Sequence, residues 1–187
     1  MSSTQAQPVF YYDLGSPACY LVAERIGAAL RQPAEWEPVL GVQLGVSERE
    51  LDRELVERLA SGDALQPLRW PKVWPPDTRM AMLAATYAKQ VGRAVAFSLA
   101  AFRQAFAGGR DLGEESTVLI AAAACEMHPT AVLKGIELRS VTRGLERAVE
   151  RARGGGVSSL PAIAVGDTVF EGRHALRDTV AALGPPS

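Results

Sequence analysis

The sequence predicts one α/β domain in which strand-rich segments at the two ends of the chain enclose a long helical segment. Two observations predict this class. Residues 9–40 read as strand, helix and strand, and residues 162–183 read as two strands and a helix. Between them lies an alanine-rich stretch whose helical periodicity is interrupted by glycine and proline. The 187 residues suffice for one substantial core but are few for two independent domains.

The first strand and the first helix are the most strongly marked elements. Residues 9–13 are mostly β-branched or aromatic and lead into a glycine turn. Ser16 suits the N-cap of a helix and Pro17 its first position, and apolar residues then recur at helical spacing to about Arg31. Residues 35–40 form a second extended segment, so the order predicts a parallel strand pair with a right-handed crossover.

The middle of the chain is expected to be helical. Ser47 and Glu50 fit a capping box at the start of one helix. After a proline-rich, aromatic loop at 67–76, Asp77 or Thr78 can cap another helix. The residues that separate the later helices are Gly92, Gly108, Gly109, Gly113, Pro129 and Gly154 to Gly156.

The C-terminal segment predicts a hairpin and a closing helix. The apolar runs 162–165 and 168–170 are separated by Gly166-Asp167, a two-residue loop in which glycine supplies the positive φ of a type II′ turn. Residues 174–183 then show a helical pattern that ends at a Gly-Pro-Pro sequence.

Composition and charge restrict the partners. Lysine and arginine number 20 against 21 acidic residues, so no broad basic surface is expected and nucleic acid is not an expected partner. The longest apolar run, residues 118–125, is far shorter than the roughly 20 residues of a membrane span, and the first residues lack a secretory signal. Cys19 and Cys125 allow at most one disulfide. We therefore expect a cytoplasmic protein that does not bind membranes.

Ser16 is the first candidate for chemistry. The unpaired amides and the dipole at the start of a helix stabilise an anion beside it. Since no acid and histidine pair lies nearby in sequence to activate the serine, its natural role is that of a hydrogen-bond donor. By spacing alone, the role of a helix cap is an adequate explanation of Ser16 and the favoured one. His128 has no ligand partner at metal spacing, so it is expected to be structural and no metal site is predicted.

Five motifs along the chain carry a family resemblance. They are Phe10-Tyr-Tyr-Asp-Leu-Gly-Ser-Pro-Ala-Cys-Tyr-Leu21, Trp36-Glu-Pro-Val-Leu-Gly41, Pro67-Leu-Arg-Trp-Pro71, Gly109-Arg-Asp111 and Ser159-Leu-Pro161. In this order they resemble 2-hydroxychromene-2-carboxylate isomerases and kappa-class glutathione transferases, which belong to the DsbA-like branch of the thioredoxin superfamily. The resemblance implies a single DsbA-like domain over 1–187. Residues 7–45 and 156–187 would form a thioredoxin-like fold, with a large all-helical insertion of residues 46–155 and a cleft between the two; a homodimer is possible by analogy.

The resemblance implies thiol chemistry centred on Ser16. Ser16-Pro-Ala-Cys19 lies where disulfide oxidoreductases carry Cys-x-x-Cys, and serine in the first place argues against a dithiol oxidoreductase. The expected cofactor is a low-molecular-weight thiol, either glutathione or a replacement such as mycothiol. The residues implied to hold it are Ser16, Pro17, Leu160 and Pro161, with a cis Leu160–Pro161 bond. Cys19 is expected to be buried.

One motif departs from the family. Relatives usually follow the hairpin with Phe-x-Gly-(Ser or Asn)-Asp-Arg, where this chain has Phe170-Glu-Gly-Arg-His-Ala175. Arg173 and His174 would repel the ammonium group of glutathione and favour an acidic or sugar-like group in the cofactor. An exposed basic first turn of the last helix is the alternative.

The expected substrate is an aromatic or electrophilic small molecule. Three aromatic residues are predicted to contact it: Tyr12, Trp70 and Trp74. Arg69, Lys72 or Arg79 could meet a carboxylate, whereas strand core and loop packing are the alternatives for the aromatic residues. The leading hypothesis is a thiol-dependent isomerase acting on an intermediate of aromatic degradation. The alternatives are conjugation of the glutathione-transferase kind, an oxidoreductase working through Cys19, and a non-catalytic thioredoxin-like binding module.

Overall fold

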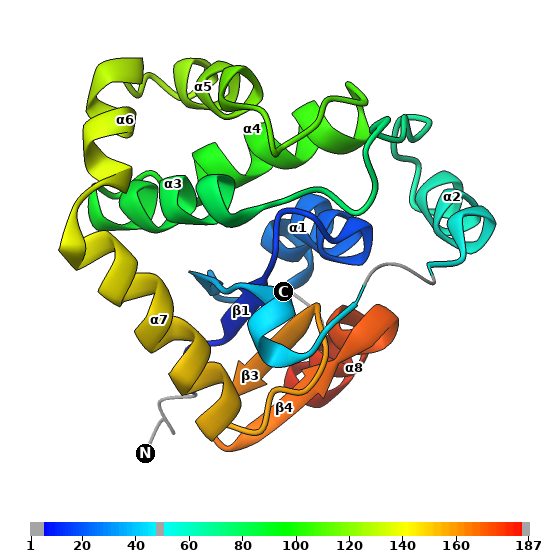
Figure 1. Ribbon diagram of the computed structural model, residues 1–187. Coiled ribbons are helices and arrows are strands. Elements are labelled where there is room, and N and C mark those ends of the chain that lie inside the picture. Colours follow the sequence, from blue (N-terminus) through cyan, green and yellow to red (C-terminus); the bar gives the residue numbers. More distant parts are fainter. Residues whose placement is uncertain (1–5, 48–50, 185–187) are drawn as a thin grey trace.

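A computed structural model describes residues 6–47 and 51–184 and is centred on a four-stranded mixed sheet (Figure 1). The strands are β1 (Val9–Tyr12), β2 (Glu35–Pro38), β3 (Ala162–Val165) and β4 (Thr168–Glu171), and they lie in the order β2-β1-β3-β4. β1 and β2 are parallel, whereas β3 is antiparallel to both β1 and β4. The predicted parallel pair and the predicted C-terminal hairpin are confirmed.

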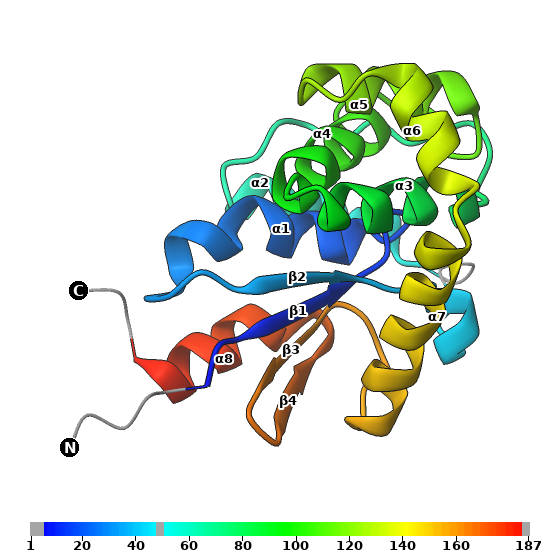
Figure 2. The ribbon, with the colours of Figure 1, turned by 90° about the vertical axis from the view of Figure 1, so that its left-hand side faces the viewer.

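Helices fill the rest of the chain. Helix α1 (Pro17–Ala29) joins β1 to β2, and α8 (Ala175–Leu183) packs against β3 and β4 and also contacts α1. The helices between β2 and β3 are α2 (Arg53–Gly62), α3 (Arg79–Gln90), α4 (Ala94–Phe106), α5 (Glu115–Ala124), α6 (Pro129–Ile136) and α7 (Arg139–Gly154). Helices α3 to α6 form a layer on the far side of α1 from β3 and β4, and α7 leads back to the strands (Figure 1, Figure 2).

Aromatic side chains join the sheet to this helical layer in one core. Phe10 and Tyr12 lie on the same side of β1 with their ring centroids 5.2 Å apart. The Tyr12 ring lies 5.9 Å from that of Phe102 on α4, and Phe106, one turn further along α4, stacks on Tyr20 of α1 at 5.5 Å. All five side chains are buried. Because α4 shares its apolar face with β1 and α1, the helical segment and the sheet fold as parts of the same hydrophobic core.

Ion pairs fasten the outer strand β2 to the helical layer. Lys89 on α3 donates to Glu35 and to Glu37, each at 2.7 Å, and Arg151 on α7 lies 3.0 Å from the Glu37 carboxylate. Glu37 is buried, and its two cationic partners compensate the charge that it carries into the interior.

The structure corrects the predicted start of the first helix in the middle segment. Helix α2 begins at Arg53, and the Asp52 carboxylate caps it by accepting from the Leu55 N–H at 2.9 Å. Ser47 is therefore not the cap, and Glu50 lies outside the described residues. The chain instead forms a short 3-10 helix, η1 (Gly41–Leu44), which ends at Gly45 in the left-handed conformation that favours glycine.

Smaller differences concern helix ends. Thr78 occupies the N-cap position of α3, but Asp77 supplies the hydrogen bond by accepting from the Arg79 N–H at 3.0 Å. A 3-10 turn, η2 (Gly172–His174), precedes α8, so the last helix begins at Ala175. Among the helices of residues 6–47 and 51–184, none is long and apolar enough to cross a membrane.

Candidate active site

Ser16 caps α1 at the point where β1 turns into the helix. Its backbone is extended, and its Oγ accepts from the Cys19 N–H at 3.4 Å, while Pro17 takes the first helical position. The Ser16 N–H donates to the Asp13 carbonyl at 3.0 Å, which closes the turn. Because a hydroxyl can accept one hydrogen bond and still donate its own proton, Ser16 can cap the helix and also bind an anion at the positive helix end.

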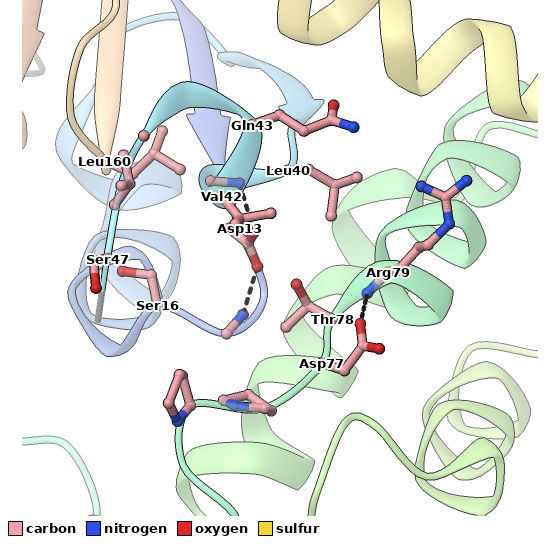
Figure 3. Close-up of a pocket in the computed structure, with 16 residues that line it drawn as sticks. Asp13, Ser16, Leu40, Val42, Gln43, Ser47, Asp77, Thr78, Arg79 and Leu160 are labelled. Carbon is pink, nitrogen blue, oxygen red and sulfur yellow. Dashed lines mark hydrogen bonds between the residues drawn. The ribbon is translucent and has the colours of Figure 1, made fainter. Parts of the chain in front are cut away.

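A cavity of about 620 Å³ opens beside this turn (Figure 3). This volume is in the range of small-molecule sites. Its walls come from four parts of the chain: the β1–α1 turn, the segment around η1, the stretch that leads into α3, and Leu160. Ser16 is among the lining residues although the residue is only 1% exposed. The serine thus reaches the cavity from within the packed turn.

The peptide bond between Leu160 and Pro161 is cis, as the resemblance implies. Leu160 lines the cavity, so the predicted serine and the residue before the predicted cis-proline meet at one site. Pro161 is buried, and its carbonyl accepts from the Gly172 N–H at 2.8 Å. The cis-proline loop is therefore fixed to the end of β4.

Asp13 is a wall residue that the sequence reasoning missed. Its carboxylate accepts from the Gly15 N–H at 2.9 Å and from the Gly41 N–H at 2.8 Å, and the Thr78 side chain also bonds to it. Burial raises the pKa of this carboxyl above its ordinary value, while the three hydrogen bonds oppose the rise. One side chain thus connects three walls of the cavity. A carboxylate two residues before a glycine at a strand end is the one local signal of such a turn.

Gly15 is required by the close approach of two of these walls. A Cβ at this position would lie 2.6 Å from the Thr78 Cγ2 atom, which is too near for any side chain to fit without movement. The glycine therefore allows the start of α3 to reach the β1–α1 turn.

Among the residues that the structure describes, Arg79 is the basic side chain that lines the cavity, next to the acidic Asp77 (Figure 3). Of the three residues expected to meet a substrate carboxylate, Arg79 is the one on the cavity wall, whereas Arg69 and Lys72 do not line it.

Tyr12 corrects the sequence-based assignment of a substrate contact. Its side chain has no exposed surface, and its hydroxyl is hydrogen-bonded to the Ser98 Oγ at 2.7 Å. Burial also raises the pKa of Tyr12, so the phenol stays protonated. Tyr12 belongs to the aromatic core that joins β1 to α4, in agreement with the alternative interpretation that it is a core residue of the strand.

Trp70 and Trp74 also lie away from this cavity. Their rings meet edge to face at 5.3 Å and both contact Phe106, while the Arg53 guanidinium lies over them at 4.9 and 5.7 Å. Trp70 also donates to Glu57 at 2.6 Å. The tryptophans therefore attach α2 to the loop before α3, and the cavity is lined instead by the two prolines that follow them.

The basic pair after the hairpin lies beside the cis-proline loop but not on the cavity wall. Arg173 is exposed and donates to His174 at 3.0 Å within η2. The hydrogen bond from Gly172 to Pro161 brings this turn next to the cis bond. Pro17, Pro161, Arg173 and His174 are thus near the site without lining the cavity itself.

Neither cysteine presents a sulfur to the cavity. Cys19 is fully buried, and Cys125 is buried at the end of α5, where burial raises the pKa of its thiol. The predicted burial of Cys19 is confirmed. In the described part of the chain, no three histidine, cysteine or acidic side chains come together as a possible metal site.

Comparison with known proteins gives a consistent fold. The family model of the DSBA-like thioredoxin domain matches residues 9–184. The structure is similar to a 2-hydroxychromene-2-carboxylate isomerase, with a TM-score of 0.82 at 20% identity over 95% of this chain and 94% of the other. It is also similar to a probable DsbA oxidoreductase from Streptomyces coelicolor, with a TM-score of 0.75 at 15% identity over 95% and 88% of the two chains.

A third structure is the cytosolic disulfide reductase DsbM from Pseudomonas aeruginosa with GSH, which has a TM-score of 0.67 at 15% identity over 94% of this chain and 98% of the other. No curated protein matches the sequence. At identities this low the likeness is one of fold, and the neighbours include both an isomerase and oxidoreductases.

Proposed function

We propose that this chain, which belongs to the DSBA-like thioredoxin family and has its fold, is a thiol-dependent isomerase of the 2-hydroxychromene-2-carboxylate isomerase type. The observation that carries the proposal is a hydroxyl, at Ser16, where a disulfide oxidoreductase needs a reactive thiol. Ser16 caps α1 on the wall of a cavity that Leu160 of the cis-proline loop also lines.

In the proposed reaction a bound thiol enters as its thiolate. The thiolate forms a carbon–sulfur bond to a conjugated carbon of the substrate, and the electron pair of the former double bond moves to the conjugated carbonyl oxygen. Rotation about the resulting single bond follows, after which the electron pair returns, the carbon–sulfur bond breaks and the thiolate is released unchanged. Ser16 and the α1 N-terminus favour the charged form of the thiol through hydrogen bonding and the helix dipole.

The thiol is proposed to be glutathione or a replacement such as mycothiol. Leu160 would pair through its main chain with a peptide-like part of this cofactor. Arg173 and His174, beside the cis-proline loop, favour an acidic or sugar-like end over an ammonium group. Arg79 on the cavity wall is proposed to bind a carboxylate of an aromatic substrate.

Conjugation of the thiol to an electrophile, as in a glutathione transferase, is the second candidate because it needs the same thiolate, stabilised by the same Ser16 hydroxyl and α1 N-terminus. Disulfide exchange is disfavoured, since the sulfur of Cys19 has no exposed surface. A non-catalytic binding module would keep the cavity without thiol binding. A cytoplasmic location and a homodimer remain parts of the proposal that rest on composition and on analogy.

The test begins with a thermal-shift screen of glutathione, mycothiol and aromatic carboxylates, because a ligand of the folded state raises Tm. Turnover is then compared for Ser16→Ala, Ser16→Gly and, as control, Ser140→Ala, which changes an exposed residue at the start of α7. Glycine at an N-cap lowers stability by only about a few tenths of a kcal/mol, although it removes the hydroxyl. Ser16→Gly therefore distinguishes a catalytic role of the hydroxyl from its role as a helix cap.

Both Ser16 variants should lose about 10²-fold in kcat with the fold intact, as expected for the loss of one donor to a developing charge. Turnover equal to that of Ser140→Ala would remove Ser16 from the mechanism. A wild-type protein that binds no thiol but binds an aromatic acid would favour the binding module instead.

A further inference from the structure

The Glu171 carboxylate makes three hydrogen bonds with the loop that precedes the cis-proline. Its Oε1 accepts from the N–H groups of Ser158 and Ser159, the latter at 2.9 Å, and its Oε2 accepts from the Ser158 hydroxyl at 2.9 Å. Two consecutive backbone amides and one hydroxyl therefore converge on a single side chain from the end of β4. Hydrogen bonds to an ionised acceptor are shorter and about twice as strong as neutral ones.

These contacts fix the chain on one side of Leu160, and the backbone fixes it on the other. Glu171 is the residue opposite Ala162 in the β3–β4 register, and the next amide, that of Gly172, donates to the Pro161 carbonyl at 2.8 Å. Leu160 thus lies between two anchors that both come from the end of β4. In the described part of the chain, the Leu160 N–H has no hydrogen-bond acceptor.

We propose that Glu171 is a positioning residue that, by holding Ser158 and Ser159, sets the direction in which the Leu160 main chain meets a thiol ligand in the cavity. The inference rests on the proposed function and extends it to a residue that does not itself line the cavity. If the Glu171 carboxylate were removed, the Gly172–Pro161 hydrogen bond would still hold the far end of the loop. Residues 158–160 would therefore change direction rather than unfold. Displacing a positioned group by about 1 Å can cost about 10²-fold in rate.

The competing interpretation is that Glu171 only adds stability to the hairpin. Two variants and one control separate the interpretations. Glu171→Ala removes every contact to the loop, whereas Glu171→Gln keeps an oxygen in the Oε1 position, which serves both backbone amides. Asp167→Asn removes a carboxylate from the exposed turn of the same hairpin, away from the loop.

The experiment measures KM and kcat for glutathione and for mycothiol, the Kd of each thiol by calorimetry, and amide hydrogen exchange at residues 158–160 in the ligand-free protein. Glu171→Ala should raise Kd and KM for the thiol at least about tenfold with kcat nearly unchanged, and should speed exchange at Ser158 and Ser159. Glu171→Gln should stay within about threefold of wild type, since the two backbone bonds persist. Asp167→Asn should match wild type.

Equal Kd for Glu171→Ala and Asp167→Asn would overturn the positioning role, and so would unchanged exchange at Ser158 and Ser159. Equal losses in both Glu171 variants that follow their losses in Tm would show a purely structural role. If the wild-type protein binds no thiol, the proposed function fails and the ligand half of the inference fails with it. The exchange data still decide whether Glu171 orders the loop.

Discussion

Removing the Tyr12 hydroxyl should weaken the fold without affecting the cavity. Tyr12→Phe deletes one partner of the 2.7 Å bond to Ser98, and both residues have no exposed surface. The Ser98 hydroxyl would then be buried without this partner, a situation that costs about 1–3 kcal/mol in proteins. For a domain of this size each kcal/mol lowers Tm by about 2–4 °C. A loss of about 2 kcal/mol would therefore lower Tm by about 4–8 °C.

The measurement is a double-mutant cycle with Ser98→Ala, followed by urea unfolding and circular dichroism. Each single variant should lose about 2 kcal/mol, because each leaves a buried hydroxyl without its partner. The double variant removes both groups and should lose about 1 kcal/mol or less. Simple addition of the single losses would instead give about 4 kcal/mol.

Additive losses would refute the reasoning, since they would mean that the two hydroxyls do not interact. The same variants test the position of the Tyr12 ring. Because the ring does not line the cavity, thiol affinity and turnover should match wild type in all three variants. A loss of activity in Tyr12→Phe that Ser98→Ala does not share would restore Tyr12 as a substrate contact.

Two further predictions concern ionisation and reactivity. Burial raises the pKa of Asp13 above 3.8, so the folded protein binds the Asp13 carboxyl proton more tightly than the unfolded chain does. The protonated Asp13 therefore contributes most to stability at low pH, and this contribution is lost as pH rises from 3.8 through the pKa of the folded state. A carboxyl ¹³C titration should give a midpoint above 3.8, and a lower midpoint would mean that the three hydrogen bonds outweigh burial. Cys19 and Cys125 are buried, so a disulfide reagent should react slowly with the native protein and quickly with both thiols in denaturant; rapid native labelling of Cys19 would revive the oxidoreductase alternative.

Local signals were enough to predict the elements that position the candidate site. The run of β-branched and aromatic residues at 9–12, the cap at Ser16 and the proline after it define β1, the turn and α1 without tertiary information. The hairpin around Gly166 was equally clear, and this glycine has the expected positive φ of 59°. The cis bond at Pro161 was predicted by family resemblance together with the adjoining hairpin, because proline at the start of a strand fits either isomer.

Side-chain direction was harder to predict. Val9 to Tyr12 are all apolar or aromatic, so no alternation tells which face of β1 meets the helical layer, and Tyr12 was assigned to the substrate. Trp70 and Trp74 lie in a loop without periodicity, where tertiary contacts such as those with Arg53, Glu57 and Phe106 define their positions. Asp13 was missed because the amide of Gly41 and the side chain of Thr78 are brought to it only by folding.

The outer edge of β2 is poorly equipped to recruit another strand. Glu35 and Val39 direct their N–H groups to β1, so the backbone nitrogen atoms of Trp36 and Pro38 point to the outer edge of the sheet. Proline has no amide hydrogen to donate there. A strand from a second molecule would meet one N–H donor on this edge, that of Trp36, whereas a β-ladder needs a donor at every second residue. The two glutamates of β2 are already paired with Lys89 and Arg151. Concentrated solutions of the protein should therefore not polymerise through this side of the sheet.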